Sequence, residues 1–126
     1  MLKLTFCLRR KPGMSREAFL AYWKDDHGPR VIGHLQAMGC RKYVQVKALA
    51  GKLAGAVARS RGGPEPFDGV AELWFDDEAS FLAHGGTDAG KAAAKDLYKD
   101  EQNFIDMPNS VIFLSEHQLV VEPGVG

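Results

Sequence analysis

Hydrophobic and polar residues alternate at the start of the chain, over residues 2–9. A period of two places successive side chains on opposite faces of a strand. The pattern therefore predicts a strand with one apolar face and one more polar face. The apolar positions are Leu2, Leu4, Phe6 and Leu8, and they alternate with Lys3, Thr5, Cys7 and Arg9.

A helix is expected to begin at about Arg16, after a turn at Pro12 and Gly13. Ser15 is a residue type that caps helix N-termini, because its hydroxyl accepts a hydrogen bond from a free backbone N–H. Glu17 adds negative charge in the first turn, where the helix dipole favours it.

One face of this helix carries Phe19, Trp23 and His27, which follow one another at intervals of four residues. Because two of the three are large and apolar, we expect the face to point inward and to bring the imidazole with it. Gly28 and Pro29 are then expected to interrupt the helix, which would leave His27 at a corner. Pro29 suits the start of a second helical segment.

The rest of the chain predicts three more strands, over residues 40–47, 67–75 and 110–121. The last two carry large apolar side chains on both faces. Between them we expect a helix that Gly85 and Gly86 divide into two. Its candidate N-caps are Asp76 or Asp77 for the first half and Thr87 or Asp88 for the second.

Residues 48–66 are rich in glycine and proline and are expected to form mostly loop. A brief helix over 49–58 is possible, but Gly51 and Gly55 would each cost it about 1 kcal/mol relative to alanine. We therefore expect a mobile insertion near the mouth of a pocket. An adaptable insertion without a role is the alternative.

The element order predicts a ferredoxin-like βαββαβ sandwich, an α+β fold with an antiparallel four-stranded sheet. Residues 1–121 would form a single domain, followed by a flexible tail over 122–126. Helices can cover only one face of such a sheet, yet the third and fourth strands appear apolar on both. A second copy is the simplest cover, so we expect a homodimer whose two sheets form a dimeric α/β barrel.

Composition narrows the class of protein. The 126 residues contain sixteen basic and sixteen acidic side chains without a basic stripe, which argues against nucleic-acid binding. No apolar run is long enough for a membrane span and no signal peptide is apparent, so we expect a cytoplasmic protein. Cys7 and Cys40 fall in predicted strands without a metal-ligand pattern, and we expect two buried thiols and no metal.

Three stretches carry a family resemblance: KPGMSREAFLAYWKDDHGP at residues 11–29, RGGPEPFDGVAELWFDD at 61–77 and DEQNFIDMPNS at 100–110. They resemble the EthD-like proteins of the dimeric α/β-barrel superfamily. The resemblance implies the fold just described, a homodimer, and a pocket between each sheet and its helices. Relatives resemble cyclases, decarboxylases, dehydratases and lactone isomerases that act on aromatic or polyketide-like molecules without a cofactor.

His27 is the first candidate for chemistry, because imidazole titrates near neutral pH, as a general base requires. The alternative is that it hydrogen-bonds backbone carbonyls freed at the Gly-Pro break. The resemblance of the H-G-P motif favours the functional role. Tyr22 and Trp23 are candidates for substrate binding, Tyr22 as a donor to a developing oxyanion, although both also suit a core.

Glu72 and Asp106 are the other candidate catalytic residues. Glu72 lies among apolar neighbours, where burial raises a carboxyl pKa, and Trp74 follows it on the same strand face as a candidate substrate contact. The alternative for Glu72 is an ion pair with Lys3 or Arg9. Asp106 could orient the histidine or simply cap the turn after it.

Three functions remain open from the sequence. The first is a cofactor-independent lyase, cyclase or isomerase in which His27 moves a proton on a hydrophobic or aromatic small molecule. The second is a non-catalytic binding protein for a hydrophobic metabolite or haem, and the third is a structural accessory to a larger enzyme. A pocket that holds His27 and another titratable group favours the first, and a lone histidine facing an open flat slot favours haem. No nucleotide-binding fingerprint is present.

Overall fold

The computed structural model describes residues 1–124 and shows a ferredoxin-like α+β sandwich, as predicted. Its sheet is antiparallel, with strand order β2-β3-β1-β4. The strands are β1 (Leu2–Leu8), β2 (Lys42–Lys47), β3 (Gly69–Phe75) and β4 (Val111–Glu116). The helices beside the sheet are α1 (Arg16–Tyr22), α2 (Gly28–Met38), α4 (Glu78–Gly85) and α5 (Asp88–Glu101), and the short 3₁₀ helix η2 (Met107–Asn109) precedes β4. No helix within residues 1–124 is long and apolar enough to cross a membrane.

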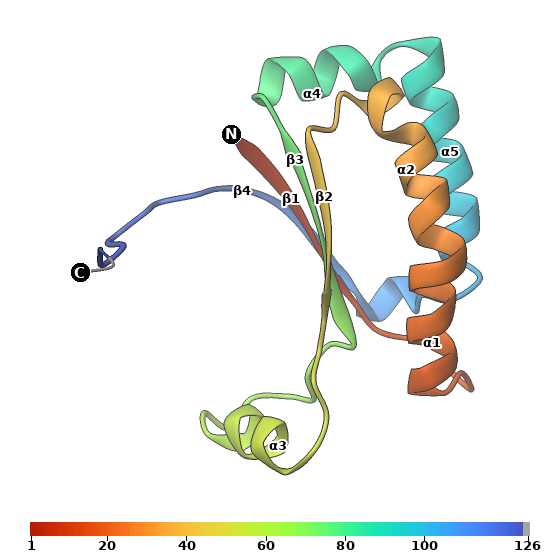
Figure 1. Cartoon of the computed structure of the whole chain (residues 1–126). Helices are drawn as coiled ribbons and strands as arrows, with labels where there is room; N and C mark the ends of the chain where they lie inside the picture. Colours follow the sequence, from red (N-terminus) through yellow and green to blue (C-terminus); the bar gives the residue numbers. More distant parts are fainter. Residues whose placement is uncertain (125–126) are drawn as a thin grey trace.

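The helices cover only one face of the sheet. Figure 1 shows α1, α2 and α5 on the same side, with α4 across one end. Strand pairing places twelve side chains on the other face, in three rows of four. The rows are Val46, Val70, Cys7 and Val111; Val44, Glu72, Thr5 and Phe113; and Lys42, Trp74, Lys3 and Ser115. This uncovered face is therefore apolar at one end and cationic at the other.

The expected helix break after His27 does not occur. The chain passes from α1 through a π-helical turn, η1 (Trp23–His27), directly into α2, so His27 does not sit at a corner. The wider π turn pairs the Gly28 N–H with the Trp23 carbonyl five residues earlier, which keeps the chain helical where Pro29 has no N–H to donate. Gln45 on β2 donates a second hydrogen bond to the same carbonyl, at 2.9 Å.

The structure of residues 48–66 and their position relative to the cavity both differ from the prediction. They contain a helix, α3 (Lys52–Arg59), whose interior holds only Gly55, because Gly51 lies outside it as the N-cap with φ +113°. One interior glycine rather than two therefore opposes the helix. The segment also lies at the opposite end of the sheet from α4 and contributes no residue to the main cavity (Figure 1). Its mobility stays a prediction.

The predicted element ends agree closely with the structure except at three strands: β2 and β3 each begin two residues later than predicted, and β4 ends earlier. Gly39 ends α2 in the left-handed conformation, with φ +68°, and the Cys40 N–H then bonds the Leu35 carbonyl, so β2 begins only at Lys42. Strand β4 ends at Glu116, because that residue pairs with Leu2 at the start of β1 and no partner strand lies beyond it. Cys7 and Cys40 are half-buried rather than buried.

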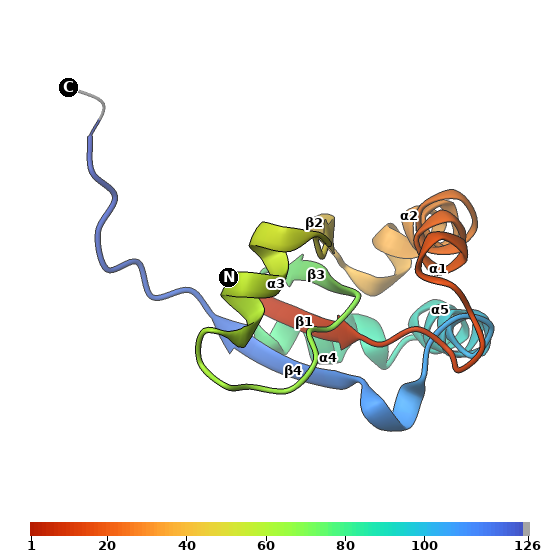
Figure 2. The same ribbon diagram turned by 90° about the horizontal axis from the view of Figure 1, so that it is seen from below.

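The predicted helix caps are present. Ser15 caps α1, Asp77 caps α4 and Thr87 caps α5, each through its side chain. Beyond β4 the chain runs away from the body of the molecule without a regular element (Figure 2). The last two residues of the expected tail, 125–126, lie outside the described residues.

Candidate functional site

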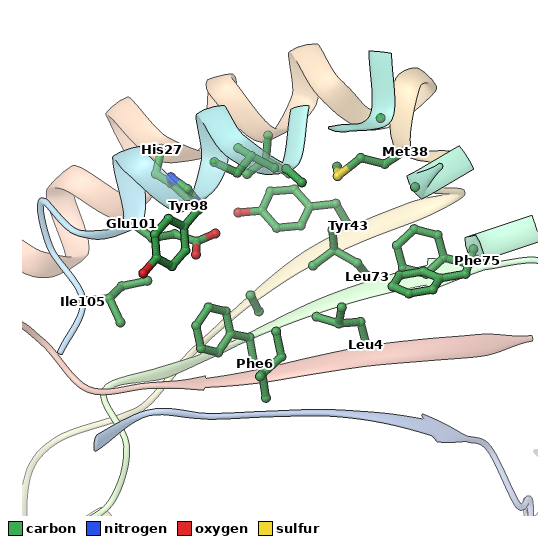
Figure 3. A pocket seen from close by; sticks show the side chains of 18 of the residues that line it. Leu4, Phe6, His27, Met38, Tyr43, Leu73, Phe75, Tyr98, Glu101 and Ile105 are labelled. Carbon is green, nitrogen blue, oxygen red and sulfur yellow. The ribbon is translucent and has the colours of Figure 1, made fainter. Parts of the chain in front are cut away.

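A cavity of about 640 Å³ lies between the sheet and helices α2, α4 and α5. Most of its wall is apolar. The side chains that carry titratable groups in this wall are His27, Tyr43, Tyr98 and Glu101, and no lysine or arginine lines it. In Figure 3 these four groups gather toward one end of the cavity, and Leu73, Phe75 and Met38 lie toward the other.

His27 occupies the polar end and is 5% exposed. Its Nδ1 lies 2.7 Å from Oδ2 of Asp100, on α5. Burial lowers the pKa of His27 below its usual value and outweighs the hydrogen bond to Asp100, which acts in the opposite direction. The ring is therefore neutral at pH 7, and Nε2 forms no hydrogen bond within residues 1–124.

Asp100 is a buried carboxylate that accepts hydrogen bonds from three side chains. Besides His27, Tyr22 donates its hydroxyl to Oδ1 at 2.6 Å and Asn103 donates Nδ2 to the same oxygen at 3.2 Å. Burial alone would raise the pKa of Asp100, but these hydrogen bonds together hold it below its ordinary value. An ionised carboxylate can only accept, so Nδ1 of His27 carries the ring proton and Nε2 carries the lone pair.

Glu101 follows Asp100 on α5, and its side chain enters the cavity instead of the Asp100 network. Burial, and then the neighbouring Asp100 carboxylate, raise the pKa of Glu101 to about 7. The cavity therefore combines a neutral imidazole with a carboxyl group that gains and loses a proton near neutral pH. Groups with pKa values near the working pH are the ones that general acid–base catalysis requires.

Tyr43 reaches the same end of the cavity from β2. Its hydroxyl oxygen accepts a hydrogen bond from Gln45 Nε2 at 2.8 Å. Burial raises the pKa of Tyr43, so the hydroxyl keeps its proton near pH 7. The polar end of the cavity therefore presents the basic lone pair of His27 and hydroxyl groups from Tyr43, Tyr98 and protonated Glu101.

Two residues expected in the site, Glu72 and Trp74, lie on the uncovered face of the sheet, away from His27. Glu72 forms the alternative ion pair with Lys3, at 2.5 Å. Trp74 packs against the ammonium groups of Lys3 and Lys42, which lie 5.3 Å and 4.7 Å from its ring centre. Both residues occupy even positions of β3, whose odd positions face the helices, so the alternation of side chains along the strand separates Glu72 and Trp74 from the cavity.

Asp106 also lies outside the cavity wall. Its carboxylate accepts a hydrogen bond from Asn109 at 2.8 Å, and its carbonyl accepts one from Ser110 at 2.8 Å. It therefore stabilises the turn at η2, which was the alternative role. Of the other two proposed aromatic contacts besides Trp74, Trp23 lines the cavity, whereas Tyr22 donates its hydroxyl to Asp100 and does not line it.

Sequence reasoning missed Asp100, Glu101 and Tyr43. The periodicity of α5 contains a signal for Glu101, because Gly90, Ala94, Leu97 and Glu101 recur at helical spacing and all line the cavity. Tyr43 and Gln45 share the strand face that looks toward the helices. Nothing in the local pattern separates Asp100 from the other acidic residues near it.

The sequence matches the EthD domain over residues 11–108. This chain belongs to the EthD family. EthD-family crystal structures include a Bacillus halodurans protein with 22% identity and a TM-score of 0.62, aligned over 94% of this chain and 99% of that one. An EthD-like protein from Ralstonia eutropha has 24% identity and a TM-score of 0.61, aligned over 97% of this chain and 94% of that one. A Bacteroides fragilis protein, described as dimeric and ferredoxin-like, has 10% identity and a TM-score of 0.57, aligned over 92% of this chain and 95% of that one.

These structures share the fold with this EthD-family chain, and no curated protein matches the sequence. The chain is a small ferredoxin-like enzyme or binding protein. Within residues 1–124 no three His, Cys, Asp or Glu side chains come together to hold a metal ion. The cavity-lining side chains of types that can ligate a haem iron are His27, Met38, Tyr43 and Tyr98.

Proposed function

We propose that this EthD-family protein is a cofactor-independent enzyme that moves a proton on a hydrophobic or aromatic small molecule, in a reaction of the lyase, cyclase or isomerase type. His27 is the general base and Glu101 the general acid. The observation that carries the proposal is the Asp100-held imidazole, whose Nε2 lone pair shares an apolar cavity with a carboxyl group of pKa about 7. An aspartate behind a histidine fixes its tautomer and stabilises the imidazolium that forms when it takes a proton.

The test uses 5-nitrobenzisoxazole, an uncharged bicyclic compound that opens its ring when a base removes its carbon-bound proton. The wild-type protein is expected to catalyse this elimination, and His27→Gln to slow it by about 10²-fold or more, since a positioned general base contributes roughly 10² to 10⁴. His34→Gln is the matched control, because His34 pairs with Asp96 at the same 2.7 Å outside the cavity. Equal rates for the wild type and His27→Gln would overturn the proposal.

Binding without turnover is the second candidate function. A histidine whose other ring nitrogen is held by a carboxylate is also a common arrangement among metal-ligating histidines, haem included. Absorbance titration with haemin separates the two functions. A His27-dependent haem spectrum in a protein that does not accelerate the elimination would favour a binding protein.

The uncovered face of the sheet supports a homodimer, and the Bacteroides fragilis relative is described as dimeric. No helix within residues 1–124 covers the apolar row Val46, Val70, Cys7 and Val111, or Phe113 beside it, which is 48% exposed. Packing these side chains against the same face of a second copy removes them from water.

Phe113→Asp is expected to convert the dimer to a monomer, because it places a charge beside the apolar row, in the contact between the two copies. Light scattering on a sizing column measures the mass. Ile32→Asp is the matched control, since Ile32 is 62% exposed on α2, in the helical layer. A wild-type monomer at micromolar concentration, or a Phe113→Asp dimer, would contradict this assembly.

A further inference from the structure

The orientation of the Tyr43 hydroxyl is fixed by its neighbour Gln45. Gln45 Nε2 contacts two oxygens, the Trp23 carbonyl at 2.9 Å and the Tyr43 hydroxyl at 2.8 Å. A carbonyl oxygen can only accept, so the amide nitrogen must face it and donate. The same nitrogen uses its second hydrogen for Tyr43, whose oxygen is therefore an acceptor in this contact.

The hydroxyl hydrogen of Tyr43 is left without an acceptor. Within residues 1–124 this hydroxyl accepts a hydrogen bond from Gln45, and its other side-chain partner, the indole N–H of Trp23, can only donate. Figure 3 shows the hydroxyl directed toward the end of the cavity that holds Glu101 and His27. A hydroxyl donor that is partly buried and unpaired points to an acceptor supplied from outside the chain.

We propose that Tyr43 is a further catalytic residue, whose hydroxyl donates a hydrogen bond to the carbonyl oxygen of an uncharged, enolisable ketone while His27 takes the proton from the adjacent carbon. The inference rests on the proposed function and names its substrate class. It follows from the arrangement at the polar end, where the basic lone pair of His27 and a fixed donor, the Tyr43 hydroxyl, line the same cavity.

The chemical step balances without a co-reactant. The C–H electron pair becomes the C=C bond of the enolate, the carbonyl π pair moves to oxygen, and the proton passes to Nε2 of His27. The oxygen then carries the negative charge and its hydrogen bond from Tyr43 strengthens, so the contact favours the transition state over the ground state. Return of a proton to a different carbon completes an isomerisation, and loss of a leaving group completes an elimination.

The charges around the cavity indicate that the substrate is neutral. A carboxylate or phosphate group would require a cationic partner, and no lysine or arginine lines the wall. The apolar end, with Leu73, Phe75 and Met38, suits a ring system without polar substituents. The geometry therefore favours a flat carbocyclic ketone with its oxygen at the Tyr43 end.

The test measures binding of an enolate mimic, 2,4-dinitro-1-naphthol, by calorimetry at about pH 6, where this naphthol is ionised and Glu101 is protonated. Its methyl ether has the same rings and no oxyanion. Tyr43→Phe is expected to weaken binding of the anion by about tenfold to a hundredfold, as for a lost hydrogen bond to a charged group, and binding of the ether by less than about threefold. Ser60→Ala is the control, since it also removes a hydroxyl but lies outside the cavity, and it should change neither affinity by more than about threefold.

Three results would overturn the inference: unchanged anion binding in Tyr43→Phe, equal weakening of both ligands, or no binding of the anion by the wild type. The elimination assay keeps this failure distinct from failure of the proposed function. If His27→Gln abolishes elimination while Tyr43→Phe binds the anion normally, His27 is supported as the general base and Tyr43 is rejected as the oxyanion donor. If Tyr43→Phe weakens anion binding while His27→Gln leaves elimination unchanged, Tyr43 is supported as a hydrogen-bond donor to the oxyanion and His27 is rejected as the general base.

Discussion

Asp100→Asn is expected to slow proton abstraction by His27 about 10²- to 10⁴-fold, because it reverses the tautomer of the imidazole. Oδ1 of Asp100 accepts from Tyr22 and Asn103, so an asparagine at this position keeps its oxygen there and turns its NH₂ toward His27. Nδ1 of His27 must then accept, which moves the ring proton to Nε2. The nitrogen that faces the cavity loses its lone pair and with it the capacity to act as a base.

The tautomer and the rate are both measurable. Nitrogen NMR of the imidazole should report a proton on Nδ1 in the wild type and on Nε2 in Asp100→Asn, and the 5-nitrobenzisoxazole assay should report the loss of rate. Asp96→Asn is the matched control, because Asp96 holds His34 at the same 2.7 Å away from the cavity. An unchanged tautomer with an unchanged rate would show that Asp100 does not position the base.

The free energy of unfolding of the wild type is expected to fall as pH rises, and Glu101→Gln is expected to abolish this decrease. The pKa of Glu101 is about 7 in the folded protein and 4.5 in the unfolded chain, so the folded state binds the extra proton between these values. The free energy of unfolding therefore falls as pH rises from about 4.5 to about 7 and stays lower above that range. At 1.36 kcal/mol per pKa unit, the free energy of unfolding decreases by about 3 kcal/mol. Glutamine does not titrate, so Glu101→Gln should lack this decrease.

Urea unfolding of both proteins at about pH 4 and about pH 8 isolates this effect, because the other titrating groups are common to the two. The difference in unfolding free energy between Glu101→Gln and the wild type should shift by about 3 kcal/mol in favour of the variant between the two conditions. Glu122→Gln, in the exposed C-terminal segment, is the matched control. A constant difference would mean that Glu101 titrates as it does in water.

The sequence alone predicted most of the fold of this EthD-family chain, because the signals that set it are local. Alternation over residues 2–9 predicted β1, and the residue types at Ser15, Asp77 and Thr87 predicted helix starts whose caps the structure shows. Gly39 ends α2 because glycine adopts the left-handed conformation without strain. Each of these depends on a few neighbouring residues and their backbone conformation.

The helix that carries His27 was only partly predictable. Spacing placed the histidine on the inward face with Phe19 and Trp23, and all three are buried. Yet the Gly28-Pro29 pair predicted a break, and the chain forms a π turn instead. That outcome depends on Gln45, which lies on a different element and supplies a hydrogen bond to the Trp23 carbonyl.

The membership of the site was decided by tertiary structure. Local pattern selected Glu72 and Asp106 as the acidic partners of His27, whereas the structure brings Asp100 and Glu101 to it from α5, more than seventy residues along the chain. Which carboxylates meet the histidine depends on how α5 is rotated and packed against α2 and the sheet. Sequence patterning fixes the inward face of each element separately, but only packing determines which inward faces share a cavity and which face of β3 is left for a partner.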